Sequence, residues 1–436
     1  MRPPRRPQGA PSQRRATRLL GAIVAGYLVL AVGYSLAVRA RWGPDEPGHL
    51  AYVESLALDG RFPVLGDQDA YRPAAAVSHQ VQHPPLYYLL AAGVYRVALP
   101  LPESARLEAL RLFSAVLGLI SLWLLWLLTG VMLAPDDPRR LAAVAALAFL
   151  PLFGYMTAVV NNDALVVLLC LAAFYTAATL MAGNGRPHRH ALLGALTGLA
   201  ILTKEVGLAL LPIAVIAALL PRGEQGPAFA RRAKGAVIAV ITALVIASPW
   251  WIRNLVLFGH PIIYAYVKPP FRGVTDAMTN PLLALAVARV WAKLSFITLW
   301  TPYWAIKGII ALTPYLAVTA AIFAIAAVGV TRLWVDHWRG AARMARVQAQ
   351  AMALMIAFAA LVATGILRYT LFVDYRTVEG GRYMLVAWPQ LAVLGAAGWA
   401  RIAGRFRLTA LWALVVSWML ADVFVLWAVG RTYNLW

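Results

Sequence analysis

The sequence contains a single cysteine, Cys170, and it lies inside an apolar run. One cysteine cannot form an intramolecular disulfide or a cysteine-based metal cluster, and it says little about the compartment. The sequence also lacks a P-loop, a dinucleotide fingerprint, an H-E-x-x-H motif and a G-x-S-x-G motif. Because no nucleotide cradle is present, direct use of ATP or of a nucleotide sugar is disfavoured.

Acidic residues are scarce as well, with 18 aspartates and glutamates against 39 lysines and arginines and a formal charge of +21. In a soluble protein this balance would suggest nucleic-acid binding. Here the arginines lie in short runs between apolar stretches, and 61% of all residues are hydrophobic. That pattern is typical of a membrane protein whose basic connectors face the cytoplasm. A nucleic-acid partner is therefore not expected.

Apolar runs long enough to cross a membrane recur from one end of the chain to the other. We predict an all-α polytopic membrane protein of about 11 spans. Residues 1–18 would form a basic cytoplasmic tail, and residues 19–436 a single transmembrane domain. The first run is too long for a signal peptide and no small-residue cleavage site follows it, so we expect it to remain uncleaved. The predicted spans are 19–38, 107–133, 139–159, 163–182, 191–203, 205–220, 235–251, 308–331, 349–373, 383–400 and 409–430.

The arginines fix the expected orientation of these spans. With a cytoplasmic N-terminus, alternation places the arginine-rich connectors inside and most acids outside. The inner connectors are 134–138, 183–190, 221–234, 332–348 and 401–408. A single long helix over 191–220 would reverse all later connectors. We therefore predict two shorter helices there, with Lys204 and Glu205 at a turn inside the membrane, where ionisable residues are usually functional.

Two outer segments, about residues 39–106 and 252–307, are too long to be simple turns. The first contains Pro85-Leu86-Tyr87-Tyr88-Leu89-Leu90, which predicts a helix at the membrane interface. The second carries tryptophan and lysine anchors among aliphatic residues, which is typical of a helix lying along the outer headgroups. Long ordered loops on one face usually carry function.

The first outer loop opens with Pro44-Asp45-Glu46-Pro47-Gly48-His49. Two adjacent carboxylates just past a span can accept a proton from a hydroxyl group or hold a cation. A divalent metal near Asp45, Glu46 and His49 is an open alternative, although no spacing matches a strong zinc signature. An ordinary loop with Asp45 as a helix N-cap would also explain the pattern.

Further polar residues recur at the predicted outer membrane level. Each is also an ordinary loop, turn or cap residue when taken alone. Together they supply acids for proton transfer and cations that can neutralise a phosphate, a combination that suits sugar transfer from a phosphate-linked lipid. The candidates for substrate and donor-phosphate binding are His83, Tyr87, Asn162, Asp163, Lys204, Glu205, Arg253, Arg382 and Tyr383.

These motifs, in this order, resemble the GT-C membrane glycosyltransferases. The resemblance is to the family 39 type, which includes protein mannosyltransferases and the aminoarabinose transferase of lipid A, and to bacterial relatives with a P-D-E-x-x-H loop. The motifs that carry it are Pro44-Asp45-Glu46-Pro47-Gly48-His49, His83-Pro84-Pro85-Leu86-Tyr87-Tyr88, Asn162-Asp163-Ala164-Leu165, Leu202-Thr203-Lys204-Glu205, Pro249-Trp250-Trp251-Ile252-Arg253-Asn254 and Gly381-Arg382-Tyr383.

The resemblance implies a GT-C helical bundle in the bacterial inner membrane. It further implies inverting transfer from a polyprenyl-phosphate sugar to an envelope glycan, lipid or protein at the outer face. Asp45 would be the general base, with Glu46 as helper or alternative base. Asp163 would lie across the cavity, and Lys204 and Arg382 would face the lipid phosphate. His83 would line the entrance beside Tyr87. Many relatives end in a soluble outer domain, whereas this sequence stops at Trp436, just past the last predicted span. We therefore expect the acceptor-recognising module to be absent or to be reduced to the two outer loops.

Two other classes of function are compatible with the same residues. Lys204 and Glu205 at a helix break would also suit a transporter or lipid flippase, although we find no paired internal repeats. A non-catalytic partner in envelope assembly would not need Asp45 or Glu46. Transport without glycosyl product, or indifference to loss of both acids, would distinguish these alternatives from a transferase.

Overall fold

The computed structural model describes residues 13–64, 80–183, 186–220, 228–262, 280–301, 313–372 and 380–433. Every regular element in these ranges is a helix. The predicted basic tail and both predicted outer loops lie partly outside the described residues.

The described helices are named here with their bounds. In chain order they are α1 (Gln13–Ala37), α2 (Glu46–Glu54), the π-helical turn η1 (Ser55–Asp59), η2 (Gln80–Gln82), α3 (Leu86–Val97), α4 (Glu103–Met132), α5 (Pro138–Ala148), α6 (Pro151–Thr157), α7 (Asp163–Met181), α8 (Pro187–Ile201), η3 (Glu205–Ala209) and α9 (Leu210–Leu219). Then come α10 (Phe229–Phe258), α13 (Pro281–Trp300), α14 (Thr313–Trp338), α15 (Arg346–Phe372), α16 (Gly381–Met384), η7 (Leu385–Ala387), α17 (Trp388–Ala403), η8 (Gly404–Phe406) and α18 (Arg407–Thr432).

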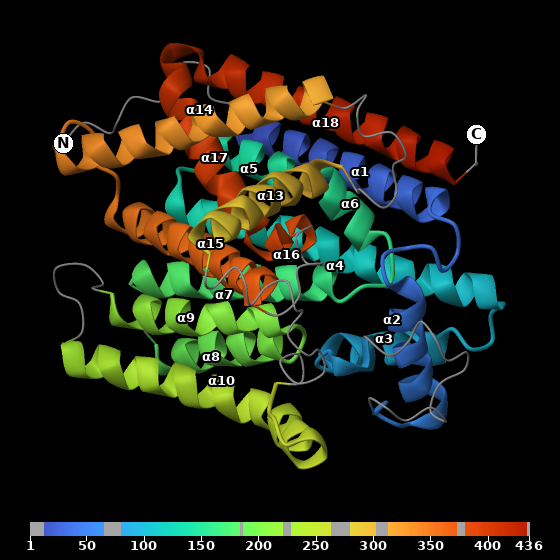
Figure 1. The fold of residues 1–436 in the computed structure, drawn as a ribbon. Helices are drawn as coiled ribbons and strands as arrows, with labels where there is room; N and C mark the ends of the chain where they lie inside the picture. The colour runs from blue at the N-terminus through green and yellow to red at the C-terminus, as the bar shows by residue number, and fades with distance from the viewer. Residues whose placement is uncertain are drawn as a thin grey trace.

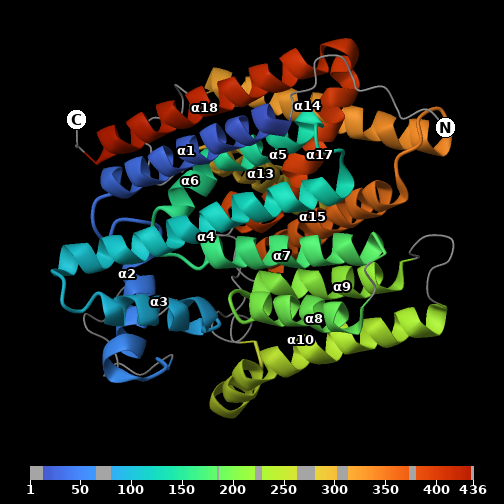
Figure 2. The ribbon, with the colours of Figure 1, turned by 180° about the vertical axis from the view of Figure 1, so that it is seen from behind.

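The long helices form a bundle, with α1 and α18 along one edge and α10 along the other (Figures 1 and 2). The short helices α2 and α3 lie together at one end, which we call the α2 end. Eight helical stretches of the described residues are long and apolar enough to cross a membrane, or nine with the bent pair α5–α6. In its described part each predicted span falls on one or more helices, with 139–159 on the bent pair α5–α6. The prediction of a multi-pass helical membrane protein is confirmed.

The segment 191–220 forms two helices, α8 and α9, as predicted. Their direction follows from close contacts between α8 and α10. A side chain at Gly194 would meet Ala239, and one at Gly198 would meet Ala243. Both contact positions move four residues toward the C-terminus, so α8 and α10 run parallel to each other. Helix α9, which lies between them in the sequence, therefore runs in the opposite direction.

The same reasoning applies to α14 and α17. Gly329 lies against Gly398, and one helical turn or more further on Arg401 Nε donates to Asp336 Oδ2 at 2.9 Å. These two helices are therefore also parallel, and α15 returns the chain between them. As a result the arginine-rich connectors 332–348 and 401–408 lie at the same end of the bundle.

Helix α13 lies in the second predicted outer segment, where an interfacial helix is expected. It is 20 residues long and apolar enough to cross a membrane by length and composition. Its C-terminal residue Trp300 is fully buried, with its ring 5.5 Å from that of Trp388 and 5.7 Å from that of Phe323. The tryptophan therefore anchors one end of α13 inside the bundle.

The close approach of α8 and α10 gives a direct test of the fold. A methyl group at Gly194 would collide with the carbonyl oxygen of Ala239, whereas one at Gly93 in α3 would meet nothing within 4 Å. Overpacking of this kind typically costs about 1–3 kcal/mol. We expect Gly194→Ala to lower the thermal unfolding temperature of the purified protein and Gly93→Ala to leave it unchanged or raise it. Equal effects of the two substitutions would contradict this packing.

Candidate active site

Four charged side chains from four elements form a chain of ion pairs at the α2 end. Arg382 in α16 donates through Nη1 to Asp45 Oδ2 at 2.6 Å and through Nε to Asp163 Oδ2 at 2.9 Å. Lys204, in the turn between α8 and η3, pairs with the other oxygen of Asp163. The order is therefore Asp45, Arg382, Asp163, Lys204, with acids and cations alternating. We call this set the ion chain.

The ion chain runs from the surface into the interior. The side chain of Asp45 is 50% exposed, that of Arg382 13%, and that of Asp163 1%. Burial by itself would raise the pKa of Asp45, but the lowering effects, of which the charge of Arg382 is the largest, together outweigh it and hold this pKa below the ordinary value. Asp45 is thus an ionised carboxylate that is open on one side.

The backbone aims Asp45 at Arg382. Asp45 has φ 57°, in the left-handed region that aspartate tolerates better than most residues. It precedes the first turn of α2, where Glu46 and Pro47 occupy the first helical positions. Because the chain turns at Asp45, the carboxylates of Asp45 and Glu46 point in different directions and meet different arginines.

Glu46 is fully buried and is not part of the ion chain. Its Oε1 accepts from Arg111 Nε at 2.9 Å and from the backbone N–H of Val160 at 3.1 Å. Its Oε2 accepts from Arg111 Nη2 at 2.8 Å and from the backbone N–H of Gly43 at 3.3 Å. Both oxygens are occupied, so the structure does not support the expected role of Glu46 as helper base.

Arg111 in α4 completes this buried pair and was missed by the sequence analysis. Its Nη1 donates to the carbonyl oxygens of Ser35 at 2.7 Å and Val38 at 3.0 Å, at the end of α1. The pair thus joins the first loop to α1 and α4. An arginine inside the predicted span 107–133 was the signal that could have identified it.

His49 lies behind the ion chain with both ring nitrogens engaged. Asn161 accepts from the N–H of Asp163 at 2.8 Å, which orients its amide so that Nδ2 donates to His49 Nε2 at 3.1 Å. The other nitrogen, Nδ1, must therefore carry the proton and donate to Tyr88 Oη at 2.8 Å. Burial and the charge of Arg382 lower the pKa of His49 to about 3, in agreement with a neutral ring.

These contacts do not fit the metal site considered from the sequence. Glu46 faces Arg111, His49 faces Asn161 and Tyr88, and Asp45 faces Arg382. Among the residues that the structure describes, no three His, Cys, Asp or Glu side chains are grouped so that they could hold a metal ion.

Tyr87 and Asn162 support the site from behind. Tyr87 is fully buried, and its hydroxyl accepts from the N–H of Asn161 at 3.0 Å and lies 3.0 Å from Ser114 Oγ. Asn162 donates to the carbonyl oxygen of Thr203 at 3.3 Å and so ties the start of α7 to the turn that bears Lys204. Neither residue lines the cavity described next.

A cavity of about 620 Å³ opens beside Lys204. Its polar lining includes four of the predicted residues, namely His83, Lys204, Glu205 and Tyr383. Burial, together with the charge of Lys204, lowers the pKa of His83 well below its ordinary value. Aliphatic residues form two walls, from η3 and α9 on one side and from α15 on the other. They are Val206, Leu208, Ala209, Pro212, Leu361, Val362, Gly365 and Ile366.

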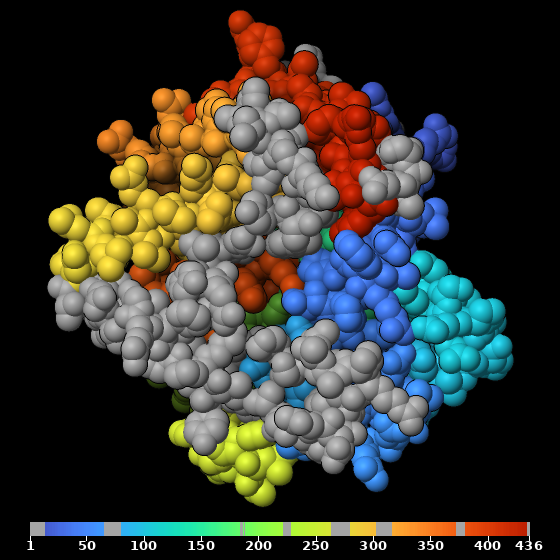
Figure 3. All heavy atoms as spheres, turned by 45° about the vertical axis from the view of Figure 1, so that its right-hand side comes forward, coloured from blue at the N-terminus to red at the C-terminus, as the bar shows by residue number. Residues whose placement is uncertain are grey.

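The ammonium of Lys204 lies 5.3 Å from the centre of the Tyr383 ring, so this cation is shared between the ion chain and the cavity. Figure 3 is turned toward the α2 end and shows α2, in blue, at the surface.

Arg253 is not brought to the site. Its Nη2 donates to Pro63 O at 2.9 Å, its guanidinium lies 4.5 Å from the Trp250 ring centre, and it does not line the cavity.

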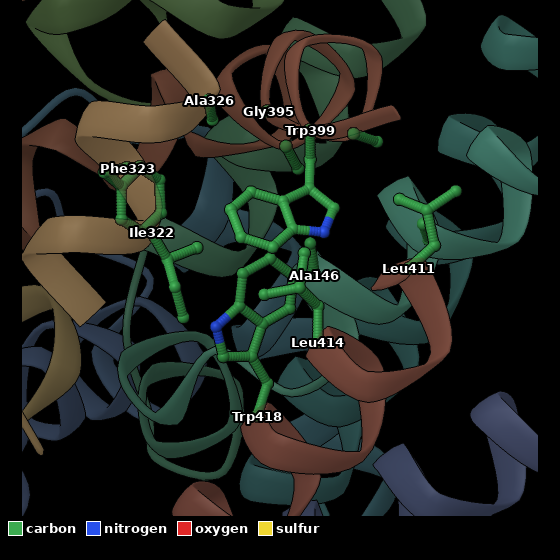
Figure 4. A pocket seen from close by; sticks show the side chains of 12 residues that line it. Ala146, Ile322, Phe323, Ala326, Gly395, Trp399, Leu411, Leu414 and Trp418 are labelled. Atoms are coloured by element: carbon green, nitrogen blue, oxygen red, sulfur yellow. The ribbon is translucent and has the colours of Figure 1, made fainter. Parts of the chain in front are cut away.

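A second hollow lies among α5, α14, α17 and α18 (Figure 4). Its lining is aliphatic and aromatic and includes Trp399 and Trp418, which lie close together in the view. At about 20 Å³ it has room for a single water molecule. It is therefore no candidate for a substrate site.

A family model described as dolichyl-phosphate-mannose-protein mannosyltransferase matches residues 82–252. The matched part contains Asp163 and Lys204 but neither Asp45 nor Arg382. No curated protein sequence matches the chain.

Two solved structures share the arrangement of the helices. The oligosaccharyltransferase of Archaeoglobus fulgidus in the apo form has a TM-score of 0.58 and 12% identity, over 94% of this chain and 56% of that one. ArnT from Cupriavidus metallidurans, bound to undecaprenyl phosphate, has a TM-score of 0.55 and 15% identity, over 94% and 77%. This chain thus spans little more than half of the archaeal enzyme. At this identity the likeness establishes the fold, and the chain has the helical GT-C fold that was expected.

The buried pair gives the prediction for this site. Glu46→Gln would remove the buried counter-charge of the Arg111 guanidinium and leave only the half-exposed Glu108, and loss of one partner of a buried pair typically costs about 3–5 kcal/mol. Glu108→Gln is the matched control, because Glu108 approaches the same arginine at 3.3 Å but is 48% exposed. We expect at most about 1 kcal/mol for the control. Thermal unfolding of both variants in lipid nanodiscs measures the difference, and an equally stable Glu46→Gln protein would contradict a stabilising pair.

Proposed function

Because the chain has the GT-C fold, we propose that it is a glycosyltransferase that moves a sugar from a polyprenyl-phosphate-linked donor to an acceptor, with inversion and with Asp45 as general base. One observation carries the proposal: the two ends of the ion chain differ. At one end Asp45 is an accessible, ionised carboxylate that can act as a base. At the other end Lys204 lines a cavity with apolar walls that can hold a lipid-linked phosphate.

The donor would occupy the cavity beside Lys204. Its aliphatic walls suit a polyprenyl chain. Lys204 lines the cavity and Arg382 is joined to it through Asp163, so that both cations would act on the phosphate. The ArnT structure holds undecaprenyl phosphate, and a further structure of the archaeal enzyme holds dolichol-phosphate, with a TM-score of 0.53 and 13% identity over 94% of this chain and 56% of that one. By analogy we assign a lipid phosphate of the same class to this chain.

The acceptor would approach from the exposed side of Asp45. Its hydroxyl or amine attacks the anomeric carbon on the face opposite the phosphate, while Asp45 takes up the proton. The bond between the anomeric carbon and the phosphate oxygen breaks, and the polyprenyl phosphate leaves with the electron pair. Lys204 and Arg382 stabilise the negative charge that develops on that oxygen. Attack from the opposite face gives inversion at the anomeric carbon.

Arg382 links donor binding to the strength of the base. In the described state it is shared between Asp45 and Asp163, and its charge lowers the pKa of Asp45. A donor phosphate would draw the guanidinium toward itself and weaken its hold on Asp45, so that the pKa of Asp45 would rise. Asp163 keeps both cations in place, and its burial leaves it unavailable to the acceptor.

The charges also suggest where the reaction takes place. If the arginine-rich connectors face the cytoplasm, the ion chain lies at the outer face of the membrane. We therefore place the protein in the bacterial cytoplasmic membrane with its site outward. The acceptor would be an envelope glycan, lipid or protein that reaches Asp45 from that side.

Asp45→Asn tests the base. The substitution keeps the size of the side chain but removes the proton acceptor, so transfer should fall by about 10²–10⁴-fold. The measurement is transfer of label from a radiolabelled polyprenyl-phosphate sugar by purified protein in membranes. Asp59→Asn, in η1 of the same loop, is the control and should retain activity. Full activity of Asp45→Asn would remove Asp45 as the base, and uptake into vesicles without glycosyl product would favour a transporter.

The lowered pKa of Asp45 predicts the acid side of the pH profile. A carboxyl whose pKa lies below its ordinary value stays ionised as the pH falls from neutral. The value of kcat/KM, which reports groups of the free enzyme, should therefore show no loss between about pH 7 and pH 5. A midpoint above about pH 5 in the wild-type profile would contradict the pairing of Asp45 with Arg382 in the free enzyme.

A further inference from the structure

The cavity has a second cation that the proposed reaction has not used. Arg368 in α15 lines the cavity together with Lys204 but belongs to the opposite wall. It shares a helix face with Leu361 and Gly365, which lie seven and three residues before it and line the same cavity. Arg368 thus lies on the cavity side of a helix long enough to span the membrane.

The ion chain by itself offers a phosphate no net positive charge. Its two cations, Lys204 and Arg382, are matched by two carboxylates, Asp45 and Asp163. The nearby His49 is neutral, since burial lowers its pKa to about 3. An anionic phosphate would therefore have to compete with Asp163 for both cations.

Arg368 differs from the cations of the ion chain. No carboxylate among the described residues lies within 4.0 Å of its guanidinium, and its side chain is exposed. An arginine on an apolar wall of a membrane protein is unfavourable unless it meets water, a headgroup or an anion. The guanidinium also matches a phosphate geometrically, because it can donate two parallel hydrogen bonds.

From this arrangement, and building on the proposed function, we infer that Arg368 supplies a second cationic contact to the lipid-linked phosphate, from the wall opposite Lys204. The phosphate would then lie between the α8–η3 turn and α15, with the polyprenyl chain along the aliphatic walls. Glu205 lines the cavity beside Lys204, where its side chain would form hydrogen bonds with sugar hydroxyls.

The test is a comparison of two lipids that differ only in the phosphate. Binding of undecaprenyl phosphate and of undecaprenol is measured for the full chain in phosphatidylcholine nanodiscs, with wild type, Arg368→Gln and Arg368→Lys. We expect Arg368→Gln to weaken binding of undecaprenyl phosphate about tenfold to a hundredfold, as for the loss of a charged hydrogen bond, and to leave undecaprenol unchanged. Arg368→Lys should retain part of the affinity.

Arg431→Gln is the matched control. Arg431 is an exposed arginine at the end of α18, beside the α2 end, and does not line the cavity. It should change neither affinity. If Arg368→Gln weakens binding of both lipids equally, Arg368 contributes only to packing, and if it weakens binding of neither, Arg368 only faces the bilayer surface. Either result overturns the inference. Displacement of undecaprenyl phosphate by phosphatidic acid at equal concentration would also overturn it, because the site would then bind any lipid phosphate headgroup.

The result of the lipid-binding experiment can be distinguished from the result of the sugar-transfer assay. If undecaprenyl phosphate binds through Arg368 but no labelled sugar is transferred, the phosphate site stands and the transferase assignment fails. If sugar is transferred and Arg368→Gln binds undecaprenyl phosphate as wild type does, the assignment stands and the role of Arg368 is refuted.

Discussion

The buried pair of Glu46 and Arg111 is the contact on which the candidate site depends. A carboxylate and a guanidinium that are both almost fully inaccessible can be stable only with complete hydrogen bonding. Here the pair recruits backbone groups from the end of α1 and from the segment before α7. It therefore fixes the first loop against α1, α4 and the segment before α7, and the position of Asp45 follows from that attachment.

Two adjacent acids consequently have opposite surroundings. Glu46 points inward to a single cation that is surrounded by backbone acceptors, whereas Asp45 points along the surface to Arg382. The difference arises at one backbone position, the left-handed Asp45, which turns the chain just before α2 begins. A loop with two carboxylates thus provides one structural acid and one accessible acid, and the accessible one is the candidate base.

The ion chain brings together segments that are far apart in sequence. Asp45, Asp163, Lys204 and Arg382 come from the ends of different helices, and each residue except the terminal two contacts charges on both sides. Because its two acids balance its two cations, the ion chain has no net charge without a ligand. An incoming phosphate therefore needs a further cation, and the α15 wall of the cavity bears one, Arg368.

The sequence by itself determined the helical membrane fold, the two short helices α8 and α9, and the set of polar residues from which the site is assembled. Hydropathy and arginine placement suffice for these because lipid and membrane asymmetry act on each span separately. Only the tertiary structure decided that Glu46 is buried against Arg111, that Arg253 lies elsewhere, and that Arg368 shares a cavity with Lys204. These contacts depend on how side chains from distant helices pack together, which a local sequence pattern cannot predict.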